Sequence, residues 1–243
     1  MKKLIEEFIT KRVSDANPSI YRKPLIGYSP ADDEIFTSLK TVVGEQHLLP
    51  VDLLPGAKTV LAFFVPYKKS IVDGNRSGVS ASWEWAQTYA CTNNLINEIC
   101  RGLNELLIGH GVKMAWLFPT YNFDKEKLMA DWSHKHVAYA CGLGQFGRNH
   151  LLITSKGCAG RFGTAVLDVP LEPSPRPETV HACPGNKSCD FCIKKCPVGA
   201  LNQAKFARHE CYRQCQANDS LFPDIECVEV CGKCSTGPCA YIE

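Results

Sequence analysis

The chain has 243 residues, and its 45% hydrophobic and 21% charged residues are close to the average for a globular protein. Its formal net charge of +2 argues against a broad polyanion-binding surface, and no apolar run approaches the about 20 residues of a membrane span. The opening residues 1–7 carry two acids within their apolar stretch, unlike a secretory signal, so we expect a cytoplasmic protein with reduced thiols and no membrane contact.

The first part of the chain predicts one mixed α/β unit over residues 1–176. Apolar residues at helical spacing within residues 4–9 predict an amphipathic N-terminal helix. Residues 15–56 are punctuated by prolines and are expected to be rich in loops. The nearly continuous apolar run 59–66 is bounded by turn residues, which predicts a buried strand.

A long helix is predicted after a polar, flexible stretch at residues 69–80. It runs from about residue 82 to 108, with Ser82 as its N-cap and an apolar stripe along one face. Gly109 is expected to end it. Residues 112–118 form the next strand candidate.

The remaining elements lead to a change in composition. We expect a helix over 124–141, strands over 151–154 and 164–168, and a proline-rich linker over 170–182. Beyond the linker, aliphatic residues become rare and cysteines common, which predicts a second, smaller domain over 177–243.

Ten of the fourteen cysteines lie between Cys183 and Cys239. The run Cys189-Asp-Phe-Cys192-Ile-Lys-Lys-Cys196-Pro197 contains C-x2-C-x3-C-P, the last part of the bacterial ferredoxin pattern. Two residues between thiolates allow one tight turn to aim both at neighbouring irons of a cubane, while the cysteine before the proline points into a second cluster. Asn186 stands where the usual first cysteine would be, and Cys183 is its expected substitute.

A second cysteine group completes the set. Its core is C-x2-C-x4-C over residues 231–239, preceded by Cys227, and Cys211 and Cys215 lie between the two groups. Two [4Fe–4S] clusters need eight thiolates, and ten are present. Structural zinc sites and a disulfide framework are the alternatives; the C-x3-C-P step and the number of thiols favour cubanes, and a reducing compartment argues against disulfides.

The sequence Gly142-Leu-Gly144-Gln-Phe-Gly147 satisfies G-x-G-x-x-G. In a dinucleotide-binding fold this motif must follow a strand and open a helix. Here a predicted helix precedes the motif and a predicted strand follows it, so we do not expect it to bind NAD or FAD.

The segment from Ala140 to Ile153, A-C-G-L-G-Q-F-G-R-N-H-L-L-I, resembles A-G-L-G-x-x-G-K-N-x-x-L-I of the epoxyqueuosine reductases. Those are corrinoid and iron–sulfur enzymes that complete queuosine in tRNA, and they are related to the corrinoid-dependent reductive dehalogenases. Residues 54–67 and 162–168 resemble further segments of that family, and the order of the C-terminal cysteines also matches. The resemblance covers roughly residues 50–243.

The resemblance implies a nitroreductase-like α/β core followed by a small ferredoxin-like domain with two [4Fe–4S] clusters. It further implies an oxidoreductase in which a donor protein, such as a ferredoxin or flavodoxin, passes electrons through the clusters to cobalamin and substrate in the core. FMN is the less favoured core cofactor. The alternative functions are a non-enzymatic electron carrier or activator of a partner protein, and a flavin-dependent reductase.

Spacing and resemblance together assign the cluster ligands. The first cluster is expected to use Cys183, Cys189, Cys192 and Cys239. The second is expected to use Cys196, Cys211, Cys231 and Cys234. Cys215 and Cys227 remain as the two spare thiols.

The resemblance also suggests residues of the core site. The loop glycines Gly142, Gly144 and Gly147 would let the backbone approach the corrin closely, and Arg148 and Asn149 would hold a phosphate or a corrin side-chain amide.

The family's catalytic Asp lies in a V-D-T-x-P segment that this chain lacks. Asp131, His134 and His136 are therefore the candidate proton donors. The chain ends four residues after Cys239, without the family's helical-repeat tail, and carries no basic stripe. We therefore expect a small molecule or a modified nucleoside as substrate, and do not expect tRNA.

Overall fold

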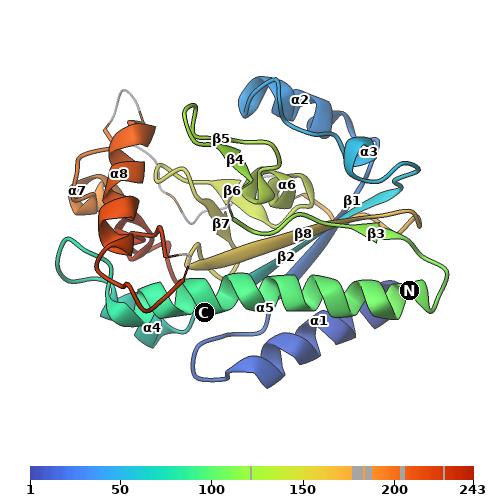
Figure 1. Cartoon of the computed structure of the whole chain (residues 1–243), viewed down its shortest axis with the longest axis horizontal. Coiled ribbons are helices and arrows are strands. Elements are labelled where there is room, and N and C mark those ends of the chain that lie inside the picture. The colour runs from blue at the N-terminus through green and yellow to red at the C-terminus, as the bar shows by residue number, and fades with distance from the viewer. Residues whose placement is uncertain (121, 177–182, 184–187, 203–205, 227) are drawn as a thin grey trace.

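A computed structural model describes residues 1–120, 122–176, 183, 188–202, 206–226 and 228–243. A four-stranded antiparallel sheet in the order β1-β2-β8-β3 lies at its centre (Figure 1). Its strands are β1 (Leu25–Pro30), β2 (Thr59–Pro66), β8 (Gly160–Leu167) and β3 (Met114–Ala115). The chain is therefore a mixed α/β protein, as the sequence predicts.

Strand β2 is buried along its whole length because both faces of the sheet are covered. Its alternating side chains enter two separate clusters: Leu61, Phe63 and Val65 belong to one, and Val60, Ala62 and Phe64 belong to the other. A strand covered on both faces needs apolar residues at every position, which explains the continuous apolar run. The predicted strand over 59–66 is confirmed at both ends.

The first face is covered by α1 (Lys2–Ala16), α4 (Lys69–Gly74) and α5 (Trp83–Ile108). The Ser82 hydroxyl accepts a hydrogen bond from Trp85 N at 3.2 Å and caps α5, which ends at Gly109. Both helices predicted for this face, at the N-terminus and over 82–108, are confirmed. The expectation of a flexible stretch over 69–80 is wrong for its first half, which is α4.

The second face carries α2 (Glu34–Val42), α3 (Pro50–Leu53) and α6 (His134–Ala140). Beside them lie two small hairpins, β4 (Phe123–Asp124) with β5 (Met129–Ala130) and β6 (Gly144–Phe146) with β7 (Leu152–Thr154). The region 15–56 thus holds β1, α2 and α3, and is more regular than expected.

The predicted helix over 124–141 is wrong in its first half. The Asp124 carboxylate accepts hydrogen bonds from the backbone N–H groups of Glu126 and Lys127, both at 2.8 Å, and Leu128 has a φ of 53°. These contacts make a tight turn that competes with helix formation. Only residues 134–140 are helical. The strand predicted over 112–118 shrinks to Met114–Ala115, whereas the strand predicted over 164–168 already begins at Gly160.

The C-terminal segment packs where β8 begins and α5 begins (Figure 1). It contains α7 (Phe191–Lys195), α8 (Arg208–Asp219) and the 3-10 helix η2 (Lys233–Ser235). Backbone hydrogen bonds of 3.0 Å join Cys158 N to Cys239 O and Ala159 N to Ala240 O. The segment is therefore tied to the central sheet. The predicted domain boundary at 176/177 borders residues 177–182, which lie outside the described residues, so the two-domain division stays a prediction.

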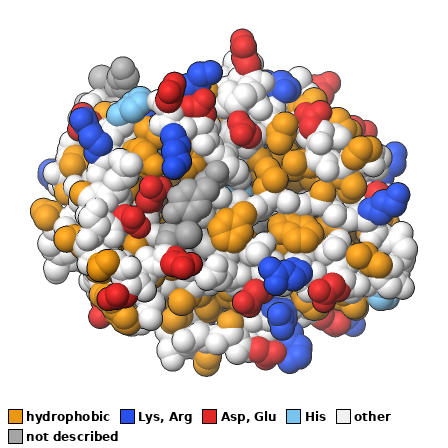
Figure 2. Space-filling model, in the orientation of Figure 1, with side chains coloured by type: hydrophobic (Ala, Val, Ile, Leu, Met, Phe, Trp, Pro, Cys, Tyr) orange, Lys and Arg blue, Asp and Glu red, His pale blue; other side chains and the backbone are white. Residues whose placement is uncertain are grey.

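Basic and acidic side chains are interspersed over the face in Figure 2, and neither sign dominates it. Within the described ranges, no helix combines the length and the apolar character needed to cross a bilayer.

Candidate metal centres and the adjoining cavity

A cavity of about 260 Å³ is lined by the four cysteines predicted to bind the first cluster and also by Cys234. The predicted four are Cys183, Cys189, Cys192 and Cys239. The C-x2-C spacing places Cys189 just before α7 and Cys192 in its first turn, so both line the same hollow. Pairing of Cys239 with Cys158 along the backbone brings the fourth thiol to them. We call this space the first cysteine cavity.

A second cavity, of about 300 Å³, is lined by the other predicted set, Cys196, Cys211, Cys231 and Cys234. Gly232 turns the backbone between the last two of these cysteines with a φ of 70°. A Cβ atom there would lie 2.2 Å from the Trp85 indole, so only glycine fits this turn. We call this space the second cysteine cavity.

Two further thiols line the second cysteine cavity. Cys215 lies one helical turn after Cys211 on α8, and Cys158 comes from the segment before β8. Sequence reasoning treated Cys215 as spare and did not place Cys158 near a cluster. Cys227, the other predicted spare thiol, lies outside the described residues. The structure thus brings together each predicted set, while the choice of ligands among the thiols of the second cavity stays a prediction.

The described thiols of the two cysteine cavities are not gathered around one point. Among the described residues, no three His, Cys, Asp or Glu side chains are grouped closely enough to hold one metal ion, and every described cysteine is a free thiol. A tetrahedral zinc ion bound by four cysteines needs all four sulfur atoms at about 2.3 Å from the ion. A cubane binds its thiolates through four separate irons and needs them spread around a volume.

A larger cavity of about 620 Å³ lies between α2, the β4–β5 hairpin, α6 and α8. Its volume is within the range of about 300–1,000 Å³ for ligand sites. Its lining is largely apolar and includes the rings of Phe123, Tyr139, Phe146, Phe206 and Tyr212. We call it the large cavity. Such walls suit a flat organic cofactor, and corrinoid and flavin both meet this condition.

The three cavities lie in series. Asn149 and Cys234 line both the first and the second cysteine cavity. Cys211, Cys215 and Lys135 line both the second cysteine cavity and the large cavity. Each neighbouring pair therefore shares part of a wall.

Lys135 is a site residue that sequence reasoning missed. It lies in α6 between two histidines, and its Nζ donates a hydrogen bond of 2.8 Å to the backbone oxygen of His150. Burial lowers the pKa of Lys135, and the positive charge of Arg208 lowers it further. The only signal in the sequence was a lysine flanked by His134 and His136.

Of the three predicted proton donors, only His136 lines the large cavity. Its Nδ1 is 2.7 Å from Ser133 Oγ, and its ring packs 4.7 Å from that of Phe146. Asp131 is exposed and does not line this cavity. His134 turns toward the sheet, with its Nδ1 2.8 Å from Thr164 Oγ1.

Both histidines are uncharged at neutral pH. Burial lowers the pKa of His134 to about 4, and burial together with the nearby Lys135 charge lowers the pKa of His136 to about 3. A neutral imidazole accepts or donates one hydrogen bond at each nitrogen, so His136 is suited to orienting a polar group rather than to acting as an imidazolium acid.

The glycine loop packs against the chain itself. A Cβ atom on Gly142 would lie 2.5 Å from Pro175 O, and one on Gly144 would lie 2.1 Å from Ile153 O. One on Gly147 would lie 2.5 Å from the Ile153 side chain. The glycines allow close packing of protein segments, and none of the three lines the large cavity. Their contact with a cofactor stays a prediction that these contacts do not support.

Arg148 and Asn149 face the cysteines. Arg148 Nη1 donates a hydrogen bond of 2.9 Å to Cys189 O. The buried Asn149 amide donates to Cys234 O at 3.3 Å and lies 3.9 Å from Cys239 Sγ. Neither residue lines the large cavity, and their expected role as corrin or phosphate contacts stays a prediction.

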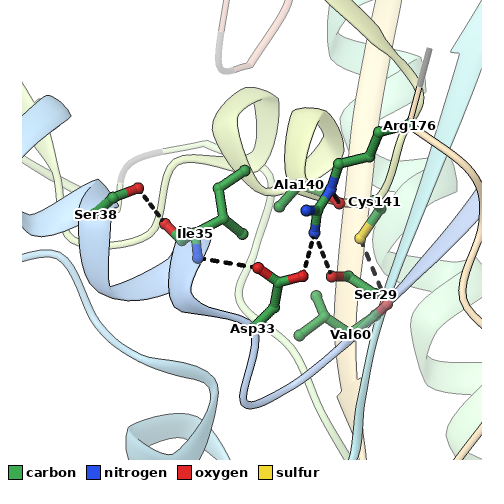
Figure 3. A network of polar contacts seen from close by, with 8 residues as sticks. All are labelled: Ser29, Asp33, Ile35, Ser38, Val60, Ala140, Cys141 and Arg176. Atoms are coloured by element: carbon green, nitrogen blue, oxygen red, sulfur yellow. Dashed lines mark hydrogen bonds and ion pairs between the residues drawn. The ribbon is translucent and has the colours of Figure 1, made fainter. Parts of the chain in front are cut away.

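A polar network joins the end of α6 to β1 and to the start of α2 (Figure 3). Other residues of α2 and α6 line the large cavity. The Arg176 guanidinium joins Ala140 O at the end of α6 to Ser29 Oγ of β1 and to the Asp33 carboxylate. Asp33 also caps α2 by accepting from Ile35 N at 3.0 Å. Burial by itself raises the pKa of Asp33, but the Ile35 N–H and the Arg176 charge outweigh it and hold the pKa below its ordinary value.

Replacing Asp33 with alanine is expected to cost about 1–2 kcal/mol of unfolding free energy, because the cap of α2 is lost. The melting temperature should fall by about 2–4 °C per kcal/mol in a chain of this size. The depressed pKa means that the carboxylate is ionised and its contribution fully present at pH 7. Asp33→Ser keeps a capping oxygen and should lose less in a thermal melt. Equal losses in both variants would show that the cap contributes nothing.

No family model matches the chain. The chain is similar to two curated proteins: it is 26% identical over 195 residues to the epoxyqueuosine reductase of Listeria monocytogenes and 27% identical over 166 residues to that of Bacillus cereus. These alignments cover 76% and 65% of this chain but 47% and 40% of the relatives. The chain thus spans less than half the length of the curated relatives it matches. The resemblance predicted from the cysteine order and glycine loop is confirmed.

Solved structures share the fold. Epoxyqueuosine reductase from Bacillus subtilis matches with a TM-score of 0.62 at 20% identity, over 98% of this chain and 66% of that chain. An epoxyqueuosine reductase with an epoxyqueuosine-modified tRNA stem loop matches with a TM-score of 0.63 at 21% identity, over the same shares. A catabolic reductive dehalogenase in complex with 3-bromo-4-hydroxybenzoic acid matches with a TM-score of 0.59 at 14% identity, over 89% of this chain and 30% of that chain.

Proposed function

From the relationship of this chain to the epoxyqueuosine reductases, we propose that it is an iron–sulfur oxidoreductase that brings electrons to a cofactor and substrate in the large cavity. The observation that carries the proposal is the series of three cavities with shared walls, two lined by cysteine sets and the third by apolar side chains. A one-electron donor protein, such as a ferredoxin or flavodoxin, is the proposed source of electrons.

The cysteines of the first and second cysteine cavities would each hold one [4Fe–4S] cluster. The potential of such a cluster depends on hydrogen bonds to its sulfurs, nearby charge and solvent exposure. Asn149 offers its amide between the two cavities, and Arg148 fixes the Cys189 backbone of the first. The chain thus supplies the ligands and also the groups that orient them.

The large cavity would hold the core cofactor, for which we favour a corrinoid. Such a cofactor supplies a metal centre that takes up single electrons and reduces a bound organic substrate. The apolar walls from α2 and the β4–β5 hairpin exclude water, and His136, oriented by Ser133, offers a neutral imidazole to a polar group. Lys135 Nζ lies where this cavity meets the second cysteine cavity and would offer a hydrogen-bond donor there.

A modified nucleoside or a similarly sized small molecule is the proposed substrate class. One solved relative is bound to a modified tRNA stem loop, so a nucleoside within RNA is also tested as a substrate. The mixed charge of the face in Figure 2 does not favour RNA binding there. Binding of the free nucleoside and of a tRNA stem loop can be compared by fluorescence anisotropy over a salt series, because phosphate contacts weaken steeply with salt.

The test of the proposal is the composition of anaerobically purified, reconstituted protein. We expect about eight irons and eight sulfides per chain, from two cubanes. Incubation with cobalamin should add about one cobalt per chain and an absorption spectrum of the base-off form. Zinc in place of iron contradicts the proposal. Iron without any corrinoid favours the electron carrier or activator, and a yellow protein with FMN favours a flavin-dependent reductase.

A further inference from the structure

Three cationic side chains line the second cysteine cavity: Lys135, Arg161 and Lys233. Within the described ranges, none of the three forms an ion pair with a carboxylate. Lys233 is 1% exposed, and Arg161 Nε is buried without a hydrogen-bond partner among those residues. Buried charge without an opposite charge is costly, so this concentration of positive charge requires an explanation.

Lys233 Nζ is surrounded by three hydrogen-bond acceptors. Its Nζ donates to Asn75 O at 2.9 Å, to Asn75 Oδ1 at 3.2 Å and to Ser77 O at 2.7 Å. Three acceptors use all three N–H bonds that only the protonated lysine possesses. All three acceptors are neutral, so they satisfy the hydrogen bonds of the ammonium without neutralising its charge.

The other two cations are also held by neutral groups. Lys135 Nζ donates to the His150 backbone oxygen at 2.8 Å. Arg161 Nη2 donates to Pro119 O at 2.9 Å, and its guanidinium lies 4.2 Å from the centre of the Tyr89 ring. Their positive charge therefore remains available to an anion in the cavity.

Acidic groups do not balance this charge. Glu229 is the one carboxylate among the described residues lining the cavity, and it accepts a hydrogen bond of 3.1 Å from the Tyr212 hydroxyl. The first cysteine cavity differs, because Arg148 is the only charged side chain among its described lining residues. The thiols of the two cavities thus lie in unequal electrostatic surroundings.

We infer that the cations Lys135, Arg161 and Lys233 give the second cluster a more positive midpoint potential than the first, so that electrons move toward the large cavity. The inference rests on the proposed function, since it requires a cluster in each cysteine cavity. A reduced cluster carries one more negative charge than the oxidised form, and nearby positive charge stabilises it. In the transfer, the first cluster loses the electron that the second gains, and no bond or proton changes place.

The experiment is a redox titration of the reconstituted full-length chain with dithionite, followed by electron paramagnetic resonance. Two reducible components are expected. Lys135→Gln and Arg161→Gln should each shift the more positive component to a lower potential and leave the other unchanged. Lys194→Gln is the control, because Lys194 is exposed and paired with Asp190 beside the first cysteine cavity. The Lys194→Gln variant should change the potential of either component less than the Lys135 and Arg161 variants change the more positive one.

Variants that bind only one of the two clusters show independently which redox component belongs to which cluster. Cys192→Ala removes a ligand of the first cluster, so the remaining cluster should titrate at the more positive potential, and Cys231→Ala should leave the more negative one. Equal potentials, the reverse order, or a shift of the more negative component in the Lys135 or Arg161 variants would overturn the inference while leaving the proposed function intact. A chain without two clusters would instead overturn the proposed function.

Discussion

Cys192→Ala is expected to lower the iron content of the reconstituted chain from about eight toward about four per chain, because the first cluster loses one of its four predicted thiolate ligands and is held less firmly. Cys192 lies in the first turn of α7 and lines only the first cysteine cavity. Cys231→Ala should give the same loss from the other site. Iron and acid-labile sulfide, measured together, should fall in parallel.

Cys100→Ala is the matched control. Cys100 is buried in α5, away from all three cavities, and burial raises its pKa to about 12, as expected of a structural thiol. Its replacement should leave the iron content unchanged. Loss of all the iron in both cavity variants would show that the two sites do not form independently, and full retention would remove these cysteines from the ligand sets.

Ser38→Trp is expected to weaken corrinoid binding at least tenfold, or by about 1.4 kcal/mol, with no change in iron content. Ser38 lies on α2 and lines the large cavity with an exposed side chain. A Trp side chain can therefore extend into the cavity without disturbing the core. The affinity is measured by titrating reconstituted protein with cobalamin and following its absorption spectrum.

Thr37→Trp separates filling of the cavity from a general effect on α2. Thr37 is the preceding residue of the same helix, is exposed and does not line the large cavity. This variant should bind cobalamin as the unmodified chain does. Equal affinity in the Ser38 variant would place the cofactor elsewhere, and equal weakening in both variants would point to a change in the helix.

The spacing of hydrophobic residues along the sequence predicted those elements whose burial follows a regular pattern. Strand β2 is covered on both faces and α5 presents one apolar stripe, so hydrophobic spacing was enough to predict both. The β4–β5 turn was missed because Asp124 bonds its side chain to the following backbone, which overrides the helical pattern of the neighbouring residues.

Some residues of the candidate site could be predicted from the sequence, and others could not. The C-x2-C spacing fits two thiols into one turn, so Cys189 and Cys192 could be placed together from the sequence alone. His136, predicted as a proton donor, lines the large cavity, and its role there stays a prediction. Lys135 could not be recognised, because an ordinary lysine becomes unusual only when other segments bury it.

The sequence by itself determined the pairing of Cys189 with Cys192, the central buried strand and the relationship to the epoxyqueuosine reductases. Each of these depends on residue types at short or ordered spacings along the chain. Only the tertiary structure decided that the three cavities lie in series and that the second cysteine cavity is lined by three cations without an ion pair among the described residues. Lys135, Arg161 and Lys233 come from separate segments, and the charge they create together depends on distance and burial, which arise only when the chain folds.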